Sequence, residues 1–330
     1  MLLIKHFRKR EKIMEQGLST DYISEIKRLK EEKNAVILAH YYQTGDIQDI
    51  ADFIGDSLAL SQKAAVTDAD IILFAGVKFM AETAKILAPE KKVLLPDMNA
   101  GCSLADSCDP VEFKKFIEAN PGRTIVTYVN TNTDIKALSD IICTSSNALQ
   151  IIESLPPGEK VIFAPDRNLG NYIQSRTERD MLIWNGTCHV HEEFSLEAIL
   201  DIRKRNPEAK IIVHPECELP VRMVADFIGS TSALLNFTRK DEGKSYIVAT
   251  EPGIIHQMKR ENPDKTYIPA PPRDSTCGCS ECNFMKLITM EKIYNCLVNE
   301  KPEIIISDEI LDEARKPILR MLEISKKAGL

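Results

Sequence analysis

The chain has 330 residues, a formal net charge of −7 and 44% hydrophobic residues, a composition that is ordinary for a globular protein. No apolar run reaches the roughly 18 residues that a membrane-spanning helix needs, and the basic residues form no stripe of the kind that binds nucleic acid. These features argue against a membrane span and a nucleic-acid partner, so the expected partner is a small molecule.

The N-terminal stretch and the nine cysteines bear on the compartment. Residues 5–10 are mostly basic, but no apolar segment of about seven residues follows them, as a secretory signal would require. We therefore expect residues 1–16 to be a solvated lead-in and the protein to be cytoplasmic. Nine cysteines in such a chain are more often metal ligands or catalytic thiols than a disulfide framework.

A repeated motif divides the chain into three similar units. IADFIGDSLALS at residues 50–61 and VADFIGSTSALL at residues 224–235 match at seven of twelve positions, and LSDIICTSSNAL at residues 138–149 is a third copy. Self-similarity at a fixed period is the signature of repeated structural units. The predicted units are residues 20–108, residues 109–194 and residues 195–299, with residues 300–330 packing back on the first unit and covering a sheet edge.

The predicted elements follow the same order in each unit. An amphipathic helix at residues 21–34, 109–122 or 195–209 precedes a β-branched apolar strand that ends in polar residues. A short helix, a strand within the repeated motif, a helix, a third strand, another helix and a last strand come next. Alternating strands and helices predict an α/β protein of three three-layer αβα units with parallel sheets, in a pseudo-threefold arrangement around a central site.

Polar side chains recur where the first strand of each unit ends. His40, Tyr128 and His214 are each followed 17 residues later by a hydroxyl residue at the start of a helix. Ligands of open parallel sheets bind outside the carboxyl ends of the strands, so these side chains should share one cavity. The expected lining residues are His40, Tyr42, Ser57, Tyr128, Asn130, Ser145, His214, Glu216 and Thr231.

The hydroxyl groups at the three helix starts have two interpretations. They could simply cap the helices, which Ser and Thr do commonly. Alternatively, with the backbone N–H groups behind them, they form sites for phosphate or carboxylate groups. Neither GxGxxG nor GxxxxGK[ST] occurs in the sequence, which disfavours a dinucleotide or a nucleoside triphosphate.

Tyr42 and Glu216 are the best acid/base candidates, followed by His40 and His214, because these groups can hold or release a proton. The alternative for Tyr42 is a core tyrosine whose hydroxyl is satisfied by hydrogen bonds.

Each unit also contributes cysteine after its last strand: Cys102, Cys188 and a group of three ending in Cys282. Three thiolates from distant loops suit an iron–sulfur cluster that keeps one iron open as a Lewis acid. The alternative is that Cys102 and Cys188 are small buried hydrophobic residues. Within the last group, spacing from the repeated hydroxyl favours Cys277 as the equivalent of the other two.

The remaining cysteines and two histidines are less informative. Four cysteines have no equivalent in the other units and are expected to be packing residues: Cys108, Cys143, Cys217 and Cys296. The CGCSEC segment is dense enough to bind zinc or form a disulfide by itself. His189 and His191 could be a metal-binding pair, although one of such a pair more often lies behind a ligand or at the surface.

With these residues laid out, the chain resembles the quinolinate synthase family. The matching stretches are AHYYQ, GDSLALS, FAGVKFMAETAKIL, LLPDMNAGCSLADSC, YVNTN, TSSNA, FAPDRNLGNYI, WNGTCHVHEEF, VHPECE, GSTSALL, ATEPGIIHQMK and CSECNFMK. The resemblance implies three α/β domains in a triangle around a [4Fe–4S] cluster. It also implies de novo NAD synthesis, in which iminoaspartate condenses with dihydroxyacetone phosphate to give quinolinate, with loss of phosphate and two waters.

The resemblance also assigns roles to residues. It implies that Cys102, Cys188 and Cys282 hold the cluster, because the family has Cys followed by xxMK, and we follow it over the spacing that favours Cys277. It implies Tyr42 as a catalytic acid/base, and we count Glu216 and His214 as catalytic too. The substrate-binding residues implied by the family are His40, Ser57, Tyr128, Asn130, Ser145, His214, Glu216 and Thr231.

Some points stay open beside the resemblance. The family often has C-x-x-C-x-x-C where this chain has C-x-C-x-x-C, so a disulfide between Cys277 and Cys279 is left undecided. L-aspartate oxidase or aspartate dehydrogenase would supply iminoaspartate as a transient partner. The alternative functions are an iron–sulfur hydro-lyase on a small dicarboxylate and a redox-sensing iron–sulfur binding protein, although a sensor would normally need a basic effector surface.

Overall fold

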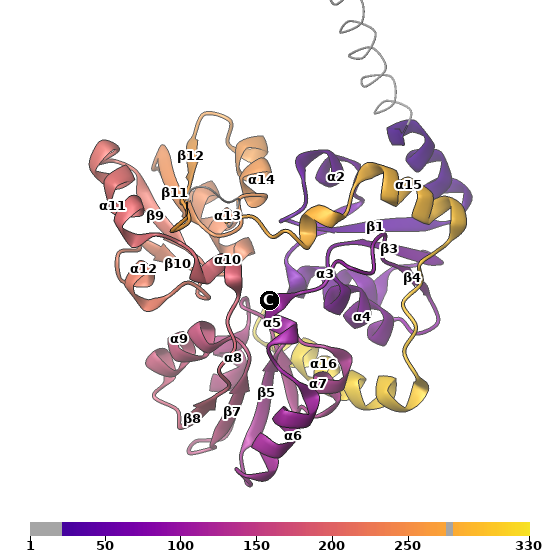
Figure 1. Cartoon of the computed structure of the whole chain (residues 1–330), viewed down its shortest axis with the longest axis horizontal. Coiled ribbons are helices and arrows are strands. Elements are labelled where there is room, and N and C mark those ends of the chain that lie inside the picture. The colour runs from indigo at the N-terminus through magenta and orange to yellow at the C-terminus, as the bar shows by residue number, and fades with distance from the viewer. Residues whose placement is uncertain (1–21, 275–279) are drawn as a thin grey trace, which may run out of the picture.

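The computed structural model describes residues 22–274 and 280–330 of the chain. The expectations for residues 1–16, Cys277 and Cys279 therefore fall outside the described residues. Three four-stranded parallel sheets with flanking helices make up the described parts, and Figure 1 shows them around a common centre. The predicted α/β class with parallel sheets is confirmed.

The three sheets have the same topology: the second strand lies at one edge, followed by the first, third and fourth strands. The elements of the first unit are a helix at residues 22–32, β1 (Ala35–His40), α2 (Gly45–Ile50), β2 (Phe53–Gly55), α3 (Ser57–Val66), β3 (Ile71–Ala75), α4 (Lys78–Leu87), β4 (Lys92–Leu94) and α5 (Ser103–Asp106). The elements of the second unit are α6 (Pro110–Glu118), β5 (Thr124–Tyr128), α7 (Thr133–Ala137), β6 (Ile141–Cys143), α8 (Ala148–Glu153), β7 (Val161–Ala164), α9 (Arg167–Thr177), β8 (Met181–Ile183) and α10 (His189–Glu192).

The sheet of the third unit is followed by three C-terminal helices. The elements of this unit are α11 (Leu196–Arg205), β9 (Lys210–Val213), α12 (Leu219–Met223), β10 (Phe227–Ile228), α13 (Thr231–Lys240), β11 (Ser245–Ala249), α14 (Ile254–Glu261) and β12 (Thr266–Pro269). The C-terminal helices are the single 3₁₀ turn η1 (Met285–Leu287), α15 (Met290–Asn299) and α16 (Asp308–Lys327). In the part of the chain that the structure describes, no helix combines the length and the apolar character needed to cross a bilayer.

The aspartate that recurs in each repeated motif fixes the register of the first two strands. The side chain of Asp52 accepts a 2.7 Å hydrogen bond from the backbone N–H of Ile37, and the Asp52 N–H donates to the Ile37 carbonyl at 3.0 Å. The same pair of bonds recurs at Asp140 with Ile125 and at Asp226 with Ile211. The aspartate thereby satisfies a backbone N–H of the first strand and ties the start of the second strand to it in the same way in each unit.

This register explains the constant step of 17 residues. His40 pairs with Gly55, and Tyr128 pairs with Cys143. In both units the repeated hydroxyl residue comes two positions after the residue that forms this pair on the second strand. Each strand-end side chain is therefore next to the hydroxyl residue that starts the neighbouring loop and helix. In the third unit Gly229 plays the part of Gly55, since its N–H donates to the Val213 carbonyl.

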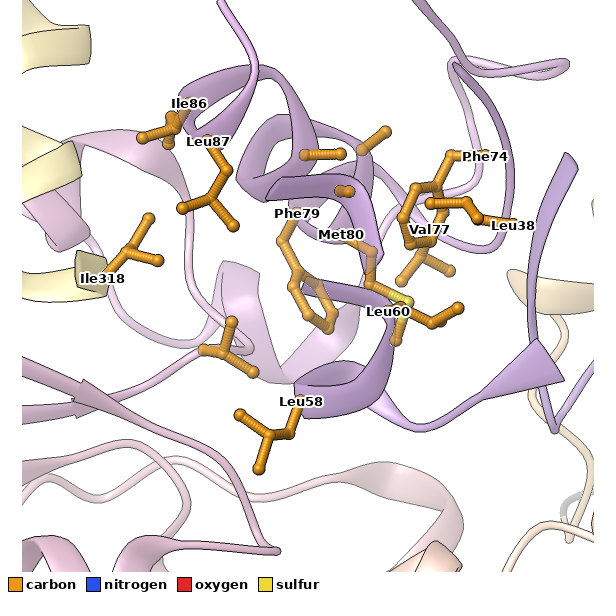
Figure 2. Packing of buried hydrophobic residues seen from close by; sticks show 14 of the residues in the cluster. Leu38, Leu58, Leu60, Phe74, Val77, Phe79, Met80, Ile86, Leu87 and Ile318 are labelled. Atoms are coloured by element: carbon orange, nitrogen blue, oxygen red, sulfur yellow. The ribbon is translucent and has the colours of Figure 1, made fainter. Parts of the chain in front are cut away.

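The C-terminal segment contacts both the first and the second units. The N–H of Ile304 donates to the Val93 carbonyl, and Glu303 forms an isolated antiparallel β-bridge with Leu94. This segment therefore covers the β4 edge, as expected. Helix α16 packs mainly against α7 and β6 of the second unit and reaches the first through α4. Figure 2 shows Ile318 of α16 in the same apolar cluster as Leu87 of α4. The long apolar face of α16 is thus buried between two units.

Candidate functional site

A cavity at the centre of the molecule is lined by residues from all three units and encloses about 680 Å³ of space, including its mouth. It lies at the carboxyl ends of the strands, where ligands of parallel sheets bind. Every site residue predicted from the sequence lines it: His40, Tyr42, Ser57, Cys102, Tyr128, Asn130, Ser145, Cys188, His214, Glu216, Thr231 and Cys282. The structure therefore brings together side chains that are up to 242 residues apart in the chain.

Two strand-end histidines have the same local geometry. Nδ1 of His40 accepts a 3.2 Å hydrogen bond from the backbone N–H of Tyr42, and Nδ1 of His214 accepts one of 3.3 Å from Glu216. Nδ1 is thereby unprotonated, so in the neutral ring the proton is on Nε2. Burial lowers the pKa of His40 to about 4 and that of His214 to about 3. Both rings are neutral hydrogen-bond donors at neutral pH, and Nε2 of His214 lies 3.3 Å from Oγ of Ser145.

The hydroxyl of Tyr42 is held between two threonines of the third unit. It lies 2.8 Å from Oγ1 of Thr231 and 2.8 Å from Oγ1 of Thr250. Burial raises the pKa of Tyr42 well above its usual value, so the phenol is protonated at neutral pH. Its hydroxyl is satisfied, but by groups that are themselves at the cavity, unlike a tyrosine in an apolar core.

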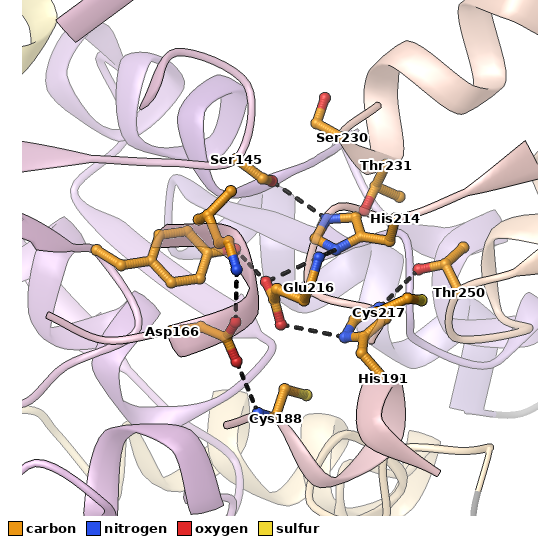
Figure 3. A network of polar contacts seen from close by, with 12 residues as sticks. Ser145, Asp166, Cys188, His191, His214, Glu216, Cys217, Ser230, Thr231 and Thr250 are labelled. Atoms are coloured by element: carbon orange, nitrogen blue, oxygen red, sulfur yellow. Dashed lines mark hydrogen bonds and ion pairs between the residues drawn. The ribbon is translucent and has the colours of Figure 1, made fainter. Parts of the chain in front are cut away.

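A continuous chain of polar contacts connects Tyr42 to Glu216. Nε2 of His191 lies 3.0 Å from Oγ1 of Thr250, and its Nδ1 lies 3.1 Å from Oε2 of Glu216, as Figure 3 shows. Burial acts to raise the pKa of Glu216, but the imidazoles of His191 and His214 and the hydrogen bond from Tyr128 outweigh it and lower the pKa. Glu216 is therefore a buried carboxylate at neutral pH and can accept a proton.

The helix starts decide between the two interpretations of the repeated hydroxyls in α3 and α13, where other residues are the caps. The caps of α3 and α13 are Asp56 and Ser230, whose side chains accept from Ala59 N and Ala233 N at 3.1 and 3.3 Å. Ser57 and Thr231 are the first helical residues instead, and Ser145 precedes the start of α8. Because Asp56 and Ser230 take the capping position and satisfy one orphan N–H group each, Ser57 and Thr231 are left to face the cavity.

The three helix starts also meet one another. Oγ of Ser146 donates to Oδ2 of Asp56 at 2.6 Å and lies 2.7 Å from Oγ of Ser230. One residue from each unit thus contributes to a polar junction beside the cavity. The N-termini of α3 and α13, both ten residues long, give this side of the cavity a partial positive charge that suits an anion.

The three candidate cluster cysteines each precede a helical turn at the cavity. Cys102 is the residue before α5, Cys188 is the residue before α10, and the Cys282 carbonyl accepts from Lys286 N at the start of η1. Burial, together with the charge of the neighbouring thiol of Cys282, raises the pKa of Cys102 to about 12. Burial also raises the pKa of Cys188 well above its usual value, and Cys102 and Cys282 add to that shift. Three thiols that oppose one another's ionisation fit a site where a cationic group binds them as thiolates.

Several groups at or beside the cavity were not predicted as site residues. His191 and Glu251 line the cavity, while Thr250 and Asp166 contact residues that line it. The ligand atoms of Cys188, His191 and Glu216 lie within 4.8 Å of one another and could hold a metal ion. His191 had been noted only beside His189, whose Nδ1 contacts Oγ of Ser103 at 2.8 Å and lies outside this group.

The cysteines without equivalents in other units are buried, as expected of packing residues: Cys108, Cys143, Cys217 and Cys296. Sγ of Cys217 donates to the Ala249 carbonyl at 3.4 Å. None of the four is among the residues lining the central cavity.

Comparisons with known proteins agree with these observations. The family model described as "Quinolinate synthetase A protein" matches residues 24–323. A quinolinate synthase of Synechococcus sp. is 56% identical over 308 residues, which cover 93% of this chain and 96% of the relative. That of Microcystis aeruginosa is 57% identical over 309 residues, covering 94% and 97%, and that of Nostoc sp. is 56% identical over 319 residues, covering 97% and 98%. The chain therefore belongs to the quinolinate synthase family of enzymes.

Proposed function

We propose that this chain condenses iminoaspartate with dihydroxyacetone phosphate to quinolinate, releasing phosphate and two waters, as a step of NAD biosynthesis. The observation that carries the proposal is the placement of three cysteines, two neutral histidines and the Tyr42–Thr250–His191–Glu216–Tyr128 contact chain around one cavity. These are the parts that a condensation with repeated proton transfers and dehydrations requires.

We propose that Cys102, Cys188 and Cys282 hold a [4Fe–4S] cluster. All three line the same cavity, and each is partly buried and presented at a turn. A cluster bound by three cysteines keeps one iron open, which supplies a Lewis acid for a substrate hydroxyl or carboxylate. The Cys188–His191–Glu216 group adds further ligand atoms at this wall of the cavity.

Substrate anions would bind where the cavity offers hydrogen-bond donors and not thiols. His40 and His214 offer neutral Nε2–H donors, and the starts of α3 and α13 offer Ser57 and Thr231 with backbone N–H groups behind them. Neutral donors and helix N-termini bind phosphate or carboxylate oxygens without a lysine or arginine. Tyr128, Asn130, Ser145 and Glu216 complete the substrate-binding set. The side-chain oxygen of Asn130 is buried and has no hydrogen-bond partner among residues 22–274 and 280–330, so it is available to a ligand.

Proton transfer would use Tyr42 as acid and Glu216 as base. Tyr42 is protonated and Glu216 is ionised because of the opposite shifts in their pKa values, and opposite shifts of neighbouring groups are typical of acid/base pairs. The hydroxyl of Thr250 and the ring of His191 connect the two, so a proton lost at one group can be restored from the other. His214, 3.7 Å from Glu216, would orient and support that base.

We also propose that the units are domains at residues 20–108, 109–194 and 195–299, with residues 300–330 packing back on the first while α16 also packs against the second. The catalyst would work in the cytoplasm, where a reducing environment keeps its free cysteines reduced. L-aspartate oxidase or aspartate dehydrogenase would hand over iminoaspartate without a stable complex.

The test is an anaerobic product analysis. The protein is incubated with iminoaspartate and dihydroxyacetone phosphate, and quinolinate and phosphate are quantified together. Equal amounts of the two products, absent when either substrate is omitted, are expected. Dehydration of a small dicarboxylate without any need for dihydroxyacetone phosphate would contradict the proposal in favour of a hydro-lyase.

A further inference from the structure

In each unit the third strand ends at an alanine. The residue two positions later is equivalent in the three units and lies at or beside the cavity. Strands β3, β7 and β11 end at Ala75, Ala164 and Ala249. The equivalent residues are Val77 in the first unit, Asp166 in the second and Glu251 in the third. Two of the three units thus place a carboxylate at the same point, and both carboxylates are completely buried.

Asp166 connects its own unit's cysteine to a helix start. Its Oδ2 accepts a 3.0 Å hydrogen bond from the backbone N–H of Cys188, and its Oδ1 accepts one of 2.8 Å from Leu169 N at the start of α9. Figure 3 shows Asp166 to the lower left of Glu216, with a dashed line to Cys188 below it. The eleven-residue helix α9 is a rigid support, so the loop of Cys188 is tied to a fixed part of the second unit.

Glu251 makes the corresponding contact in the third unit. Its Oε1 accepts a 3.4 Å hydrogen bond from the backbone N–H of Cys282, and its Oε2 accepts one of 2.7 Å from Gly253 N. Lys286, four residues after Cys282, lies 2.8 Å from Oε1 of Glu251 and donates to the carbonyl of Tyr42 at 2.8 Å. The cysteine loop is thereby held by both the third and the first units.

The first unit lacks this device. Val77 is apolar and lines the cavity, and the loop that leads to Cys102 is tied through its backbone instead, since Lys78 N donates to the Ala100 carbonyl at 2.7 Å. The carboxylates are therefore not a general feature of the strand ends. Only the second and third units have such a carboxylate, and in each it accepts a hydrogen bond from the backbone N–H of that unit's cysteine.

We propose that Asp166 and Glu251 are positioning residues that hold the loops of Cys188 and Cys282 before a metal group arrives. This inference rests on the proposed function in one respect, namely that these cysteines are cluster ligands. A loop that is already ordered loses less conformational entropy when its thiolate binds, and hydrogen bonds behind metal ligands typically contribute about 10–100-fold to metal affinity. Each carboxylate acts on the cysteine of its own unit.

The experiment compares Asp166→Asn with Glu251→Gln in the full chain. Asn retains one oxygen, which can still cap α9, and replaces the acceptor facing Cys188 N–H by an amide NH₂. The first readout is the rate at which the anaerobically loaded protein releases iron to a ferrous chelator, which we expect to rise at least about tenfold in each variant. Ser195→Ala, which removes the cap of α11 without touching a cysteine, is the matched control and should release iron like the unaltered protein.

The second readout is the alkylation rate of each thiol in the metal-free protein, followed by peptide mass spectrometry. Asp166→Asn should accelerate labelling of Cys188 about tenfold and leave Cys282 within twofold, and Glu251→Gln should do the reverse, because local opening exposes only the released loop. A loss of general stability would accelerate both cysteines alike in either variant. That result, or wild-type iron release and labelling in both, would overturn the inference.

A further variant separates this inference from the proposed cofactor. If Cys188→Ala binds as much iron as the unaltered protein, the cluster proposal itself is wrong. If Cys188→Ala loses iron while Asp166→Asn behaves like the unaltered protein, only the positioning role is wrong. Circular dichroism monitors folding, and should Asp166→Asn not fold, Glu251→Gln decides the question through Cys282 alone.

Discussion

The hydroxyl of Tyr128 donates a 2.5 Å hydrogen bond to Oε1 of Glu216, across a sequence separation of 88 residues. Tyr128 ends the first strand of the second unit, and Glu216 follows the first strand of the third. Burial raises the pKa of Tyr128 well above its usual value, so the phenol keeps its proton and stabilises the ionised carboxylate. The acid/base groups therefore depend on the assembly of several units and not on any single one.

Tyr42→Phe removes a hydroxyl that contacts both Thr231 and Thr250. We expect turnover to fall by about 10²–10⁴-fold, because an acid/base group contributes that much, while the brown colour and iron content stay unchanged. Quinolinate formation and the visible spectrum are measured on the same anaerobic sample. The control is Tyr41→Phe, at the adjacent residue, which does not line the cavity and should keep its activity. Unchanged turnover in Tyr42→Phe would remove the residue from the mechanism.

His40 predicts a pH dependence of stability. Burial lowers the pKa of His40 in the folded state to about 4, whereas its pKa in the unfolded chain is about 6.5. Between these values the unfolded chain binds a proton at His40 and the folded chain does not. Stability is therefore lost as the pH falls from about 6.5 towards 4, by about 2 kcal/mol at pH 5. His40→Gln should show a smaller decrease in melting temperature between pH 7 and pH 5, by a few degrees.

The control for this experiment is His256→Gln at a partly exposed imidazole that lies 2.9 Å from Asp49. This substitution removes a histidine that does not line the cavity, so the acid sensitivity should stay as in the unaltered protein. Equal pH dependence in His40→Gln and the unaltered protein would contradict the assignment of a neutral, buried His40.

Asp140→Ala tests the role of the recurring aspartate. Its Oδ2 accepts from the N–H of Ile125, and no ion pair involves Asp140 among the described residues, so the substitution removes one register-fixing hydrogen bond. We expect the free energy of unfolding to fall by about 1 kcal/mol, with iron content and turnover retained. Asp134→Ala, at an exposed aspartate six residues earlier, is the control and should be near neutral. A large loss of activity at unchanged stability would show that Asp140 serves the site instead.

The repeat in the sequence was enough to predict the three parallel sheets and the gathering of their strand ends. The step of 17 residues reflects a strand register that holds in every unit, which is why His40 and Ser57, or Tyr128 and Ser145, could be paired without coordinates. Cys102 and Cys188 followed from equivalent positions in the same way, and both line the cavity.

Other parts of the site could not be predicted from spacing. Asp166 and Glu251 occupy equivalent positions, but Val77 in the first unit breaks the pattern, so only a comparison of AGVK, APDR and ATEP would have marked them. His191 acts through contacts with the third unit, which no local pattern of the second unit reveals. Whether the repeated hydroxyls cap their helices was left open by the sequence, because Ser and Thr commonly cap, whereas in α3 and α13 the residues before them do so.

The most direct test of the central claim is iron and sulfide analysis of anaerobically purified cysteine variants. We predict that Cys102→Ala, Cys188→Ala and Cys282→Ala each lose most of the bound iron and the brown colour. Cys277→Ala, and the packing control Cys296→Ala in α15, should keep close to four irons per chain, as a [4Fe–4S] cluster requires. Full iron in any of the first three variants, or loss of iron in Cys277→Ala alone, would contradict a cluster held at the central cavity by one cysteine from each unit.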